Sequence, residues 1–307
     1  MITYLKTTLI LLSFICIQGV VAQENESTLT KKEKETTISS IRTHLKDTYI
    51  DLELSNKMIA ELNKSLKSKK YKSITNPNEF SKILTQDLQN SSNDLHLKVR
   101  YEPKRIAQKK RVMPDDIKLK IEQKMAIQMA EVNFGFIETK ILKGNIGYLN
   151  LRMFADTKYA QDAATSAMNF LSNTNAIIID LRTNGGGLPN MVQLLASYFC
   201  QESPVLLSNF YERKTDTKTQ LYTLTQVDGK RQTNKPLYIL TSKNTFSAAE
   251  AFAYSLKHLD KATIVGEVTK GGANRTKRIS LNDAFTISIP YIKSIHPITK
   301  SNWEGIT

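Results

Sequence analysis

Apolar side chains recur three and four residues apart through the first third of the chain, which is the spacing of amphipathic helices. The segments "ISSIRTHLKDTYIDLELSNKMIAELNKSLKS" and "SITNPNEFSKILTQDLQ" both show it, and Pro77 stands near the start of the last predicted helix. The pattern predicts a bundle of about three helices, forming an N-terminal domain over residues 37–92. The polar and charged residues 23–36 before it predict a flexible lead-in.

Near residue 93 the pattern changes to that of an α/β protein. Alternation in "HLKVRY" predicts a strand that carries His96, and the β-branched run "NAIIIDLR" is typical of a strand buried on both faces. A helix at "LPNMVQLLASYFC", a strand at "PLYILTS", a helix after Ser247 and a strand at "ATIVGE" follow. Strands that alternate with helices predict parallel pairing with right-handed crossovers, so residues 93–307 are expected to form one α/β core. The later "AFTISIPYIKSI" predicts a further antiparallel strand, and the core is expected to have a mixed sheet.

Residues 1–22 are set apart from the fold by their composition. The stretch "MITYLKTTLILLSFICIQGVVAQ" has an early lysine, an apolar run and small residues before Gln23, which is the layout of a secretory signal peptide. It predicts export to the periplasm or the extracellular space. An uncleaved anchor is the competing interpretation, although the apolar run is short for a membrane span. The residues before Cys16 do not form a convincing lipoprotein box, and no stable membrane insertion is expected once the segment is removed.

The net charge bears on the expected binding partners, and the cysteine content bears on the expected disulfides. A formal net charge of +14 could indicate binding to nucleic acid or to an anionic membrane. The lysines, however, are spread over amphipathic segments and loops, without the motifs or interleaved aromatic residues of nucleic-acid binding, so a solvated basic surface is the preferred interpretation. Cys200 is the only cysteine after residue 22, so no internal disulfide is expected. Its apolar neighbours predict a buried helix residue.

Two turns are the candidate chemical features of the core. "DLRTNGGG" follows a buried strand, and three successive glycines let a ligand approach the main chain closely. It matches neither common phosphate-binding motif, and it could be a tight turn without a ligand. "NTFSAAE" follows the next strand, where Ser247 could be a helix cap in a capping box with Glu250 or a nucleophile. Carboxyl ends of parallel strands meet at one sheet edge, so the two turns are expected to meet.

A nucleophilic serine at this place would need oxyanion donors and a base. The N–H groups of Gly186 and Ala248 are the candidate donors, one from each turn. The base can be a histidine or a lysine. His258 lies about 16 Å along the helix from Ser247 at 1.5 Å per residue, which is too far. His296 has no recognisable motif around it, but it could line a pocket.

Five motifs in this order resemble those of the tail-specific, or C-terminal processing, serine peptidases. They are "DLHLKV", "NIGYLNL…F", "DLRTNGGG", "TFSAAEAFA" and "GEVTKGGA". The closer similarity is to the branch that includes the tricorn core and the repeats of interphotoreceptor retinoid-binding protein. The resemblance implies a ClpP/crotonase-like α/β core preceded by the small helical bundle. Between Tyr101 and "NIGYLNL" there are only about 45 residues, too few for the PDZ domain of the processing proteases.

The resemblance also implies the catalytic residues. Processing proteases pair their serine with a lysine, and the position of that lysine is Gly272 here. Lys270 is displaced by two residues and is the lesser candidate base. The other branch uses serine, histidine and glutamate, which implies Ser247, His96 in its "D-x-H" motif and Glu304 in "SNWEGIT". The chain stops at Thr307, before the proline and aspartate that follow this segment in the family, so a C-terminally truncated core is expected.

The sequence thus predicts an exported serine peptidase that acts on peptide or protein substrates. His96 would remove the Ser247 proton, Glu304 would orient His96, and the N–H groups of Gly186 and Ala248 would stabilise the oxyanion. No metal or organic cofactor is expected, because no histidine–carboxylate spacing resembles a ligand set. The main alternative is a non-catalytic binding protein for apolar ligands or peptides on the same scaffold; a lactamase- or esterase-like acyl hydrolase is the third. The oligomeric state and the cleavage specificity are not predicted.

Overall fold

The computed structural model of the chain describes residues 28–110 and 114–304. The predicted signal segment, residues 1–22, lies outside this part. Within the described ranges, none of the helices combines the length and the apolar character that crossing a membrane requires.

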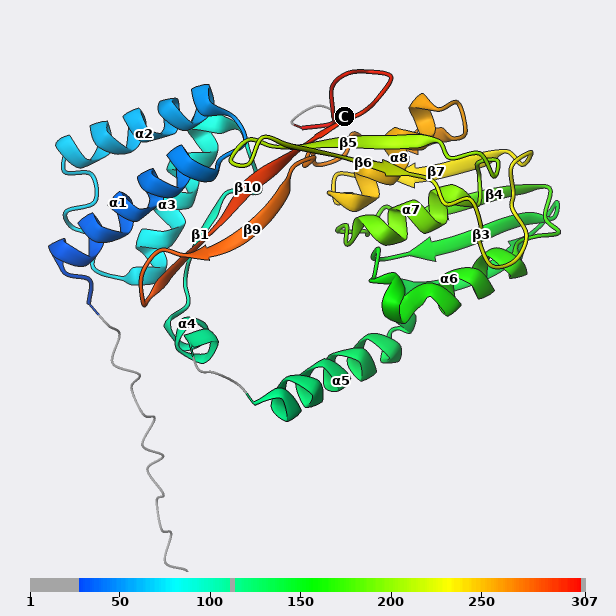
Figure 1. The fold of residues 1–307 in the computed structure, drawn as a ribbon, viewed down its shortest axis with the longest axis horizontal. Coiled ribbons are helices and arrows are strands. Elements are labelled where there is room, and N and C mark those ends of the chain that lie inside the picture. The colour runs from blue at the N-terminus through cyan, green and yellow to red at the C-terminus, as the bar shows by residue number, and fades with distance from the viewer. Residues whose placement is uncertain (1–27, 111–113, 305–307) are drawn as a thin grey trace, which may run out of the picture.

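Three helices form the N-terminal part, as the apolar spacing predicts (Figure 1): α1 (Lys31–Thr48), α2 (Leu52–Lys67) and α3 (Pro77–Ser92). Helix α1 begins inside the segment predicted to be a flexible lead-in, and that part of the prediction is wrong. Thr30 and Glu33 form a capping box: the Glu33 N–H donates to the Thr30 hydroxyl at 3.2 Å, and the Thr30 N–H donates to the Glu33 carboxylate at 2.7 Å. This cap begins the helix despite the polar composition.

The helical bundle does not enclose its core alone. One apolar cluster joins side chains of α1–α3 to those of β1 (Lys98–Tyr101) and β10 (Phe285–Ile295). The Phe285 ring lies edge-on to Phe80 of α3, with 5.8 Å between the ring centroids. A strand near the C-terminus therefore completes the core of the N-terminal helices. The predicted domain boundary after residue 92 passes through this shared core.

An antiparallel sheet carries that strand. Its order is β1-β10-β5-β6, and β9 pairs with β10. The sequence analysis did not predict three of these strands: β5 (Leu206–Glu212), β6 (Thr217–Tyr222) and β9 (Arg275–Ser280). Strand β6 is exposed along most of its length, and β9 has no fully buried residue, so neither shows the apolar alternation on which strand prediction depends.

A second sheet, in the order β2-β3-β4-β7-β8, forms the α/β core. Strands β4, β7 and β8 are parallel, as predicted; β3 is parallel to β4, and β2 is antiparallel to β3. Helices between the strands cover it, and their apolar faces share one buried cluster with the sheet (Figure 1). The bounds are β2 (Phe136–Leu142), β3 (Ile146–Leu151), α6 (Thr157–Phe170), β4 (Ala176–Asp180), α7 (Pro189–Ser197), β7 (Leu237–Thr241), α8 (Ala248–His258) and β8 (Thr263–Gly266).

The connection between the two parts contains the helices α4 (Pro103–Lys110) and α5 (Asp115–Glu131) and the short 3-10 helix η1 (Asn133–Gly135). Helix α5 buries none of its residues and extends away from both sheets (Figure 1).

Strands β4 and β7 are parallel neighbours with Asp180 opposite Leu240. The glycine turn and the serine turn therefore leave the same edge of the sheet.

Candidate active site

The glycine turn and the serine turn touch, as their places after parallel strands predict. A Cβ added at Gly186 would lie 2.8 Å from the Ser247 Cβ, 2.8 Å from the Phe246 carbonyl oxygen and 3.0 Å from the Ala248 nitrogen. Gly186 also has φ 103°, a conformation that side chains disfavour. Glycine at this position thus allows the contact between the two turns.

Asn184 fastens these turns to each other. It is fully buried, its carbonyl oxygen accepts from the Phe246 N–H at 3.1 Å, and its side-chain oxygen accepts from the Gly186 N–H at 2.8 Å. The predicted oxyanion donor Gly186 is therefore engaged in this structure. The N–H of the next glycine, Gly187, has no hydrogen-bond partner among the described residues, and Gly187 lines the cavity beside Ser247. The sequence analysis missed Asn184, although it stands within the quoted motif.

Ser247 occupies a strained position between β7 and α8. Its φ of 56° and ψ of −116° are unusual for a residue with a side chain. Serine nucleophiles of other hydrolases sit on comparably sharp strand-to-helix turns, which expose the hydroxyl. Ala248 is the first residue of α8, so its N–H has no intrahelical acceptor and is available to an anion.

Glu250 connects the serine turn to the segment "GEVTKGGA". Its buried carboxylate accepts from the Ser247 N–H at 2.6 Å, which is the part of the predicted capping box that Glu250 supplies. The same carboxylate accepts from the N–H groups of Gly271 at 2.6 Å and Gly272 at 2.9 Å, and from the Thr269 hydroxyl at 2.6 Å. Burial raises the pKa of Glu250, and these donors oppose the increase. The network fixes both turns in one position.

His96 lies in the turn before β1 and not on a strand, which corrects the sequence prediction. Its backbone N–H donates to Asp94 Oδ1 at 2.9 Å, and this local bond holds the turn. The imidazole is 8% exposed and packs against the Phe246 ring with 4.9 Å between centroids. Its Nδ1 lies 3.4 Å from Asp94 Oδ1 and 3.9 Å from Glu304 Oε1. Neither ring nitrogen has a hydrogen-bond partner within the described residues.

Glu304 reaches His96 from the far end of the chain. Its Oε2 accepts from the N–H groups of Ala273 at 2.6 Å and Asn274 at 3.3 Å, while Oε1 is buried and has no hydrogen-bond partner in the described part of the chain. Trp303 anchors the segment, because its indole N–H donates to the Gly272 carbonyl at 2.9 Å. One carboxylate oxygen is thus fixed by backbone donors, and the other is the nearer to His96 Nδ1.

The charges of this group are coupled. Burial and the negative charge of Asp94 raise the pKa of Glu304 to about 7, although His96 opposes the increase. Burial alone would lower the pKa of His96, but the nearby carboxylates of Asp94 and Glu304 outweigh it and raise that pKa. The surroundings therefore stabilise a protonated imidazole, which is the state that a general base reaches after it accepts a proton.

Asp94 is a second carboxylate at His96 to which the sequence analysis assigned no role. The Tyr49 hydroxyl of the N-terminal helical part donates to Asp94 Oδ2 at 2.9 Å, and burial raises the pKa of this phenol. The "D-x-H" spacing was the available signal. Asp94, His96 and Glu304 also offer ligand atoms that lie within 4.8 Å of one another, a donor set that could hold a divalent cation. The expectation of no metal remains a prediction.

The other candidates lie elsewhere. Lys270 is exposed, its Nζ lies 5.2 Å from the centre of the Phe246 ring, and it does not line the cavity beside Ser247. His258 and His296 are neighbours, with 5.5 Å between ring centroids, and neither lines that cavity. Cys200 is buried, as predicted, but it lies after the end of α7 at Ser197 and not on a helix. Burial raises its pKa, which disfavours a reactive thiolate.

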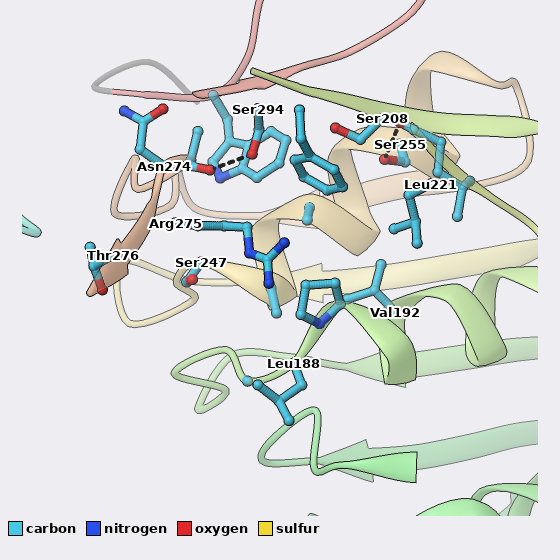
Figure 2. Close-up of a pocket in the computed structure, with 18 of the residues that line it drawn as sticks. Leu188, Val192, Ser208, Leu221, Ser247, Ser255, Asn274, Arg275, Thr276 and Ser294 are labelled. Carbon is cyan, nitrogen blue, oxygen red and sulfur yellow. Dashed lines mark hydrogen bonds between the residues drawn. The ribbon is translucent and has the colours of Figure 1, made fainter. Parts of the chain in front are cut away.

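A cavity of about 250 Å³ opens beside Ser247. It lies between the two sheets and receives side chains from the glycine turn, from α7 and α8, and from strands of the antiparallel sheet (Figure 2). Ser247 and His96 both line it. Its apolar lining comes mainly from Leu188, Pro189, Val192, Leu207, Phe210 and Leu221. The cavity could accept part of a peptide or another apolar ligand next to the serine.

Comparison with known protein families agrees with this geometry. The family model of peptidase family S41 matches residues 145–307, which are more than half of the chain. The chain belongs to peptidase family S41. Residues 25–137 match the N-terminal domain of peptidase S41 in eukaryotic interphotoreceptor retinoid-binding protein. The predicted resemblance to the tail-specific peptidases is thereby confirmed.

Individual relatives of this S41 chain are processing proteases. It is 28% identical over 149 residues to the carboxyl-terminal-processing protease of Synechocystis, covering 48% of this chain and 33% of that protein. It is 25% identical over 168 residues to the carboxy-terminal processing protease CtpB of Bacillus subtilis, covering 54% of this chain and 33% of that protein. The chain spans about a third of the length of these curated relatives.

Solved structures share the fold over most of the chain. A putative peptidase from Parabacteroides merdae superposes with a TM-score of 0.58 at 17% identity, over 88% of this chain and 86% of its own. The photosystem II D1 C-terminal processing protease superposes with a TM-score of 0.54 at 13% identity, over 91% and 92%. The predicted fold class, a helical N-terminal part followed by an α/β core with a mixed sheet, is confirmed.

Proposed function

We propose that this S41 chain is a serine peptidase that hydrolyses peptide bonds through an acyl-enzyme on Ser247. The observation that carries the proposal is the convergence of three distant segments at one cavity. Ser247 and His96 line that cavity, and Glu304 lies behind His96 with Oε1 3.9 Å from Nδ1. A binding protein would have no need of this strained serine, buried histidine and buried carboxylate together.

In the proposed mechanism His96 is the general base. Its Nδ1 is the nitrogen nearer to the Asp94 and Glu304 carboxylates, so Nε2 is the nitrogen that takes the proton from the Ser247 hydroxyl. The serine oxygen then bonds to the peptide carbonyl carbon, and the imidazolium returns its proton to the leaving amine. Water, activated by the same imidazole, hydrolyses the acyl-enzyme. No direct bond from Ser247 to His96 is needed before substrate binds, since catalytic contacts tighten in the complex.

The oxyanion would be held by backbone donors of the two turns. The Ala248 N–H supplies one. The glycine turn supplies the other, either from Gly186 after it releases Asn184 or from Gly187, whose N–H lacks a partner in the described structure. Both sources are rigidly placed by the contact between the turns, which is the condition for effective oxyanion stabilisation.

The substrates in this proposal are peptides or proteins met after export. The curated relatives are named for processing carboxyl termini, which is consistent with a protein substrate. Export rests on the predicted signal segment, residues 1–22. An apolar-ligand binding protein is the second candidate, because the cavity has a mainly apolar lining.

A fluorophosphonate that reacts with activated serines tests the proposal. We expect covalent labelling at Ser247, located by peptide mass spectrometry, and its loss in Ser247→Ala and in His96→Ala. Ser255 offers a matched control, because it lines the same cavity and its hydroxyl donates to the Leu207 carbonyl at 3.5 Å. Labelling should persist in Ser255→Ala. A folded wild-type protein that resists labelling but binds an apolar ligand tightly would favour the second candidate.

A further inference from the structure

The cavity beside Ser247 contains a positively charged side chain for which the proposed mechanism has no use. Arg275, the first residue of β9, lines the cavity together with Ser247, and it extends toward the cavity from that strand (Figure 2). Its side chain is exposed, and no ion pair joins it to any acidic group of the described chain. Its guanidinium is therefore available to an acidic group of a bound molecule.

The Arg275 guanidinium lies over an aromatic ring. Its Cζ lies 5.5 Å from the centre of the Phe210 ring, which is a cation–π contact. Stacking on an aromatic face leaves the N–H groups at the guanidinium edge open. These groups are donors in a fixed fork that matches the two oxygens of a carboxylate. The contact with Phe210 therefore restrains Arg275 at the cavity without using its N–H groups.

The cavity offers that fork no carboxylate, although hydroxyl groups and the Asn274 amide line it. None of the described residues that line it is an aspartate or a glutamate. Glu304 binds the two residues before Arg275: its Oε2 accepts from the N–H groups of Ala273 and Asn274, and its Oε1 lies toward His96. A carboxylate partner for Arg275 must consequently come from the bound molecule.

We propose that Arg275 is a specificity-determining residue that binds a substrate carboxylate close to the scissile bond. A cavity of about 250 Å³ holds roughly one or two residues of an extended peptide, so the carboxylate lies that near to the bond attacked by Ser247. It is either the C-terminal carboxylate of the peptide or the side chain of an aspartate or glutamate. The inference rests on the proposed function and names the substrate class of the same site. Hydrolysis itself is unchanged.

Matched peptide pairs test the proposal and distinguish the two sources. One pair carries a neutral sequence with either a free C-terminal carboxylate or a C-terminal amide. The other pair is blocked at both ends and differs only by glutamate against glutamine. We expect kcat/KM to favour the carboxylate member of one pair by about 10- to 100-fold, the effect of a charge-assisted hydrogen bond. The preference should disappear in Arg275→Gln and partly return in Arg275→Lys.

Arg278→Gln is the matched control. Arg278 lies on the same strand, does not line the cavity and forms an ion pair with Glu102 at 3.2 Å, so its removal changes the net charge equally. The preference should persist in this variant. Equal kcat/KM for the members of both pairs in the wild type, or a preference retained by Arg275→Gln, overturns the proposal.

Two further measurements separate this proposal from the proposed function. Labelling of the wild type by a neutral fluorophosphonate reports on Ser247 alone, because this probe carries no carboxylate for Arg275 to bind. Fluorescence anisotropy with the Ser247→Ala variant measures the affinity for the same peptide pairs without turnover. Carboxylate-dependent binding that Arg275→Gln removes supports the inference even if the wild type resists labelling. Labelling without any carboxylate preference refutes the inference and leaves the peptidase proposal intact.

Discussion

Gly186→Ala should damage the chemistry of Ser247 without removing any catalytic group. The added methyl would lie 2.8 Å from the Ser247 Cβ and from the Phe246 carbonyl oxygen, and 3.0 Å from the Ala248 nitrogen. These distances are about 0.4 to 0.6 Å shorter than the 3.4 Å at which ordinary contact begins. Two of the three atoms are backbone, so the turn that carries the proposed nucleophile must move.

The expected loss follows from that displacement. A misplacement of about 1 Å costs roughly 100-fold in rate, and the loss of one oxyanion donor costs about 100- to 1,000-fold. A shift of about half that distance should reduce the labelling rate at Ser247 by about 10- to 100-fold. Alanine at φ 103° also adds about 1–3 kcal/mol of backbone strain, so the thermal midpoint should fall by several degrees.

The assay is the second-order rate of fluorophosphonate labelling, measured beside thermal unfolding. Gly185→Ala is the matched control, because a Cβ at Gly185 would meet nothing within 4 Å and its φ lies outside the left-handed region. It should label nearly as fast as the wild type. A folded Gly186→Ala variant that labels within twofold of Gly185→Ala would refute the reasoning from contact between the turns.

Three further predictions concern the base and its supports. The nearby carboxylates raise the pKa of His96 above 6.5, and only the neutral imidazole accepts a proton, so the labelling rate should fall on acidification with a midpoint above pH 6.5. Glu304→Gln should move this midpoint to lower pH; an unmoved midpoint would contradict the effect of the Glu304 charge on His96. Tyr49→Phe leaves the buried Asp94 carboxylate without its hydroxyl donor and should lower the free energy of unfolding by about 1.5–3 kcal/mol in denaturant titrations, whereas a loss under 0.5 kcal/mol would contradict this. Gly272→Ala would place its Cβ 2.8 Å from the His96 Cε1 and closer still to the Phe246 ring, so the labelling rate should fall about tenfold or more. A wild-type rate would show that the two rings repack freely.

The parallel core was predictable because its signal is local. The run "NAIIIDLR" is apolar on both faces, and strands followed by helices allow few topologies. The hairpin of β5 and β6 was not predictable in this way, since β6 is mostly exposed and its stability comes from pairing with a neighbour. The start of α1 was predicted too late, because the composition of the lead-in outweighed the capping signal at Thr30 and Glu33.

Most residues of the candidate site could be named from the sequence, but their arrangement in space could not. Strand order alone brings the two turns together, but no spacing in the sequence places Glu304 beside His96; that assignment depended on the family resemblance. The anchoring roles of Glu250 and Asn184 could not be predicted, since each binds backbone groups of segments distant in sequence. The hydrogen bond from Tyr49 could not be predicted either, because its acceptor Asp94 lies 45 positions away in the sequence.

Gly272 limits how the base of this site can be exchanged during evolution. In the lysine-dependent branch of the family the side chain at this position is the base, whereas here a Cβ at Gly272 would lie 2.1 Å from the Phe246 ring. The volume that such a lysine needs is already filled by Phe246 and His96. A lysine can enter only if Phe246 moves or becomes smaller, and either change disturbs the ring that packs against His96, the proposed base. Under the proposed mechanism, a single exchange of Gly272 for lysine would therefore displace the support of one base before the other is in place.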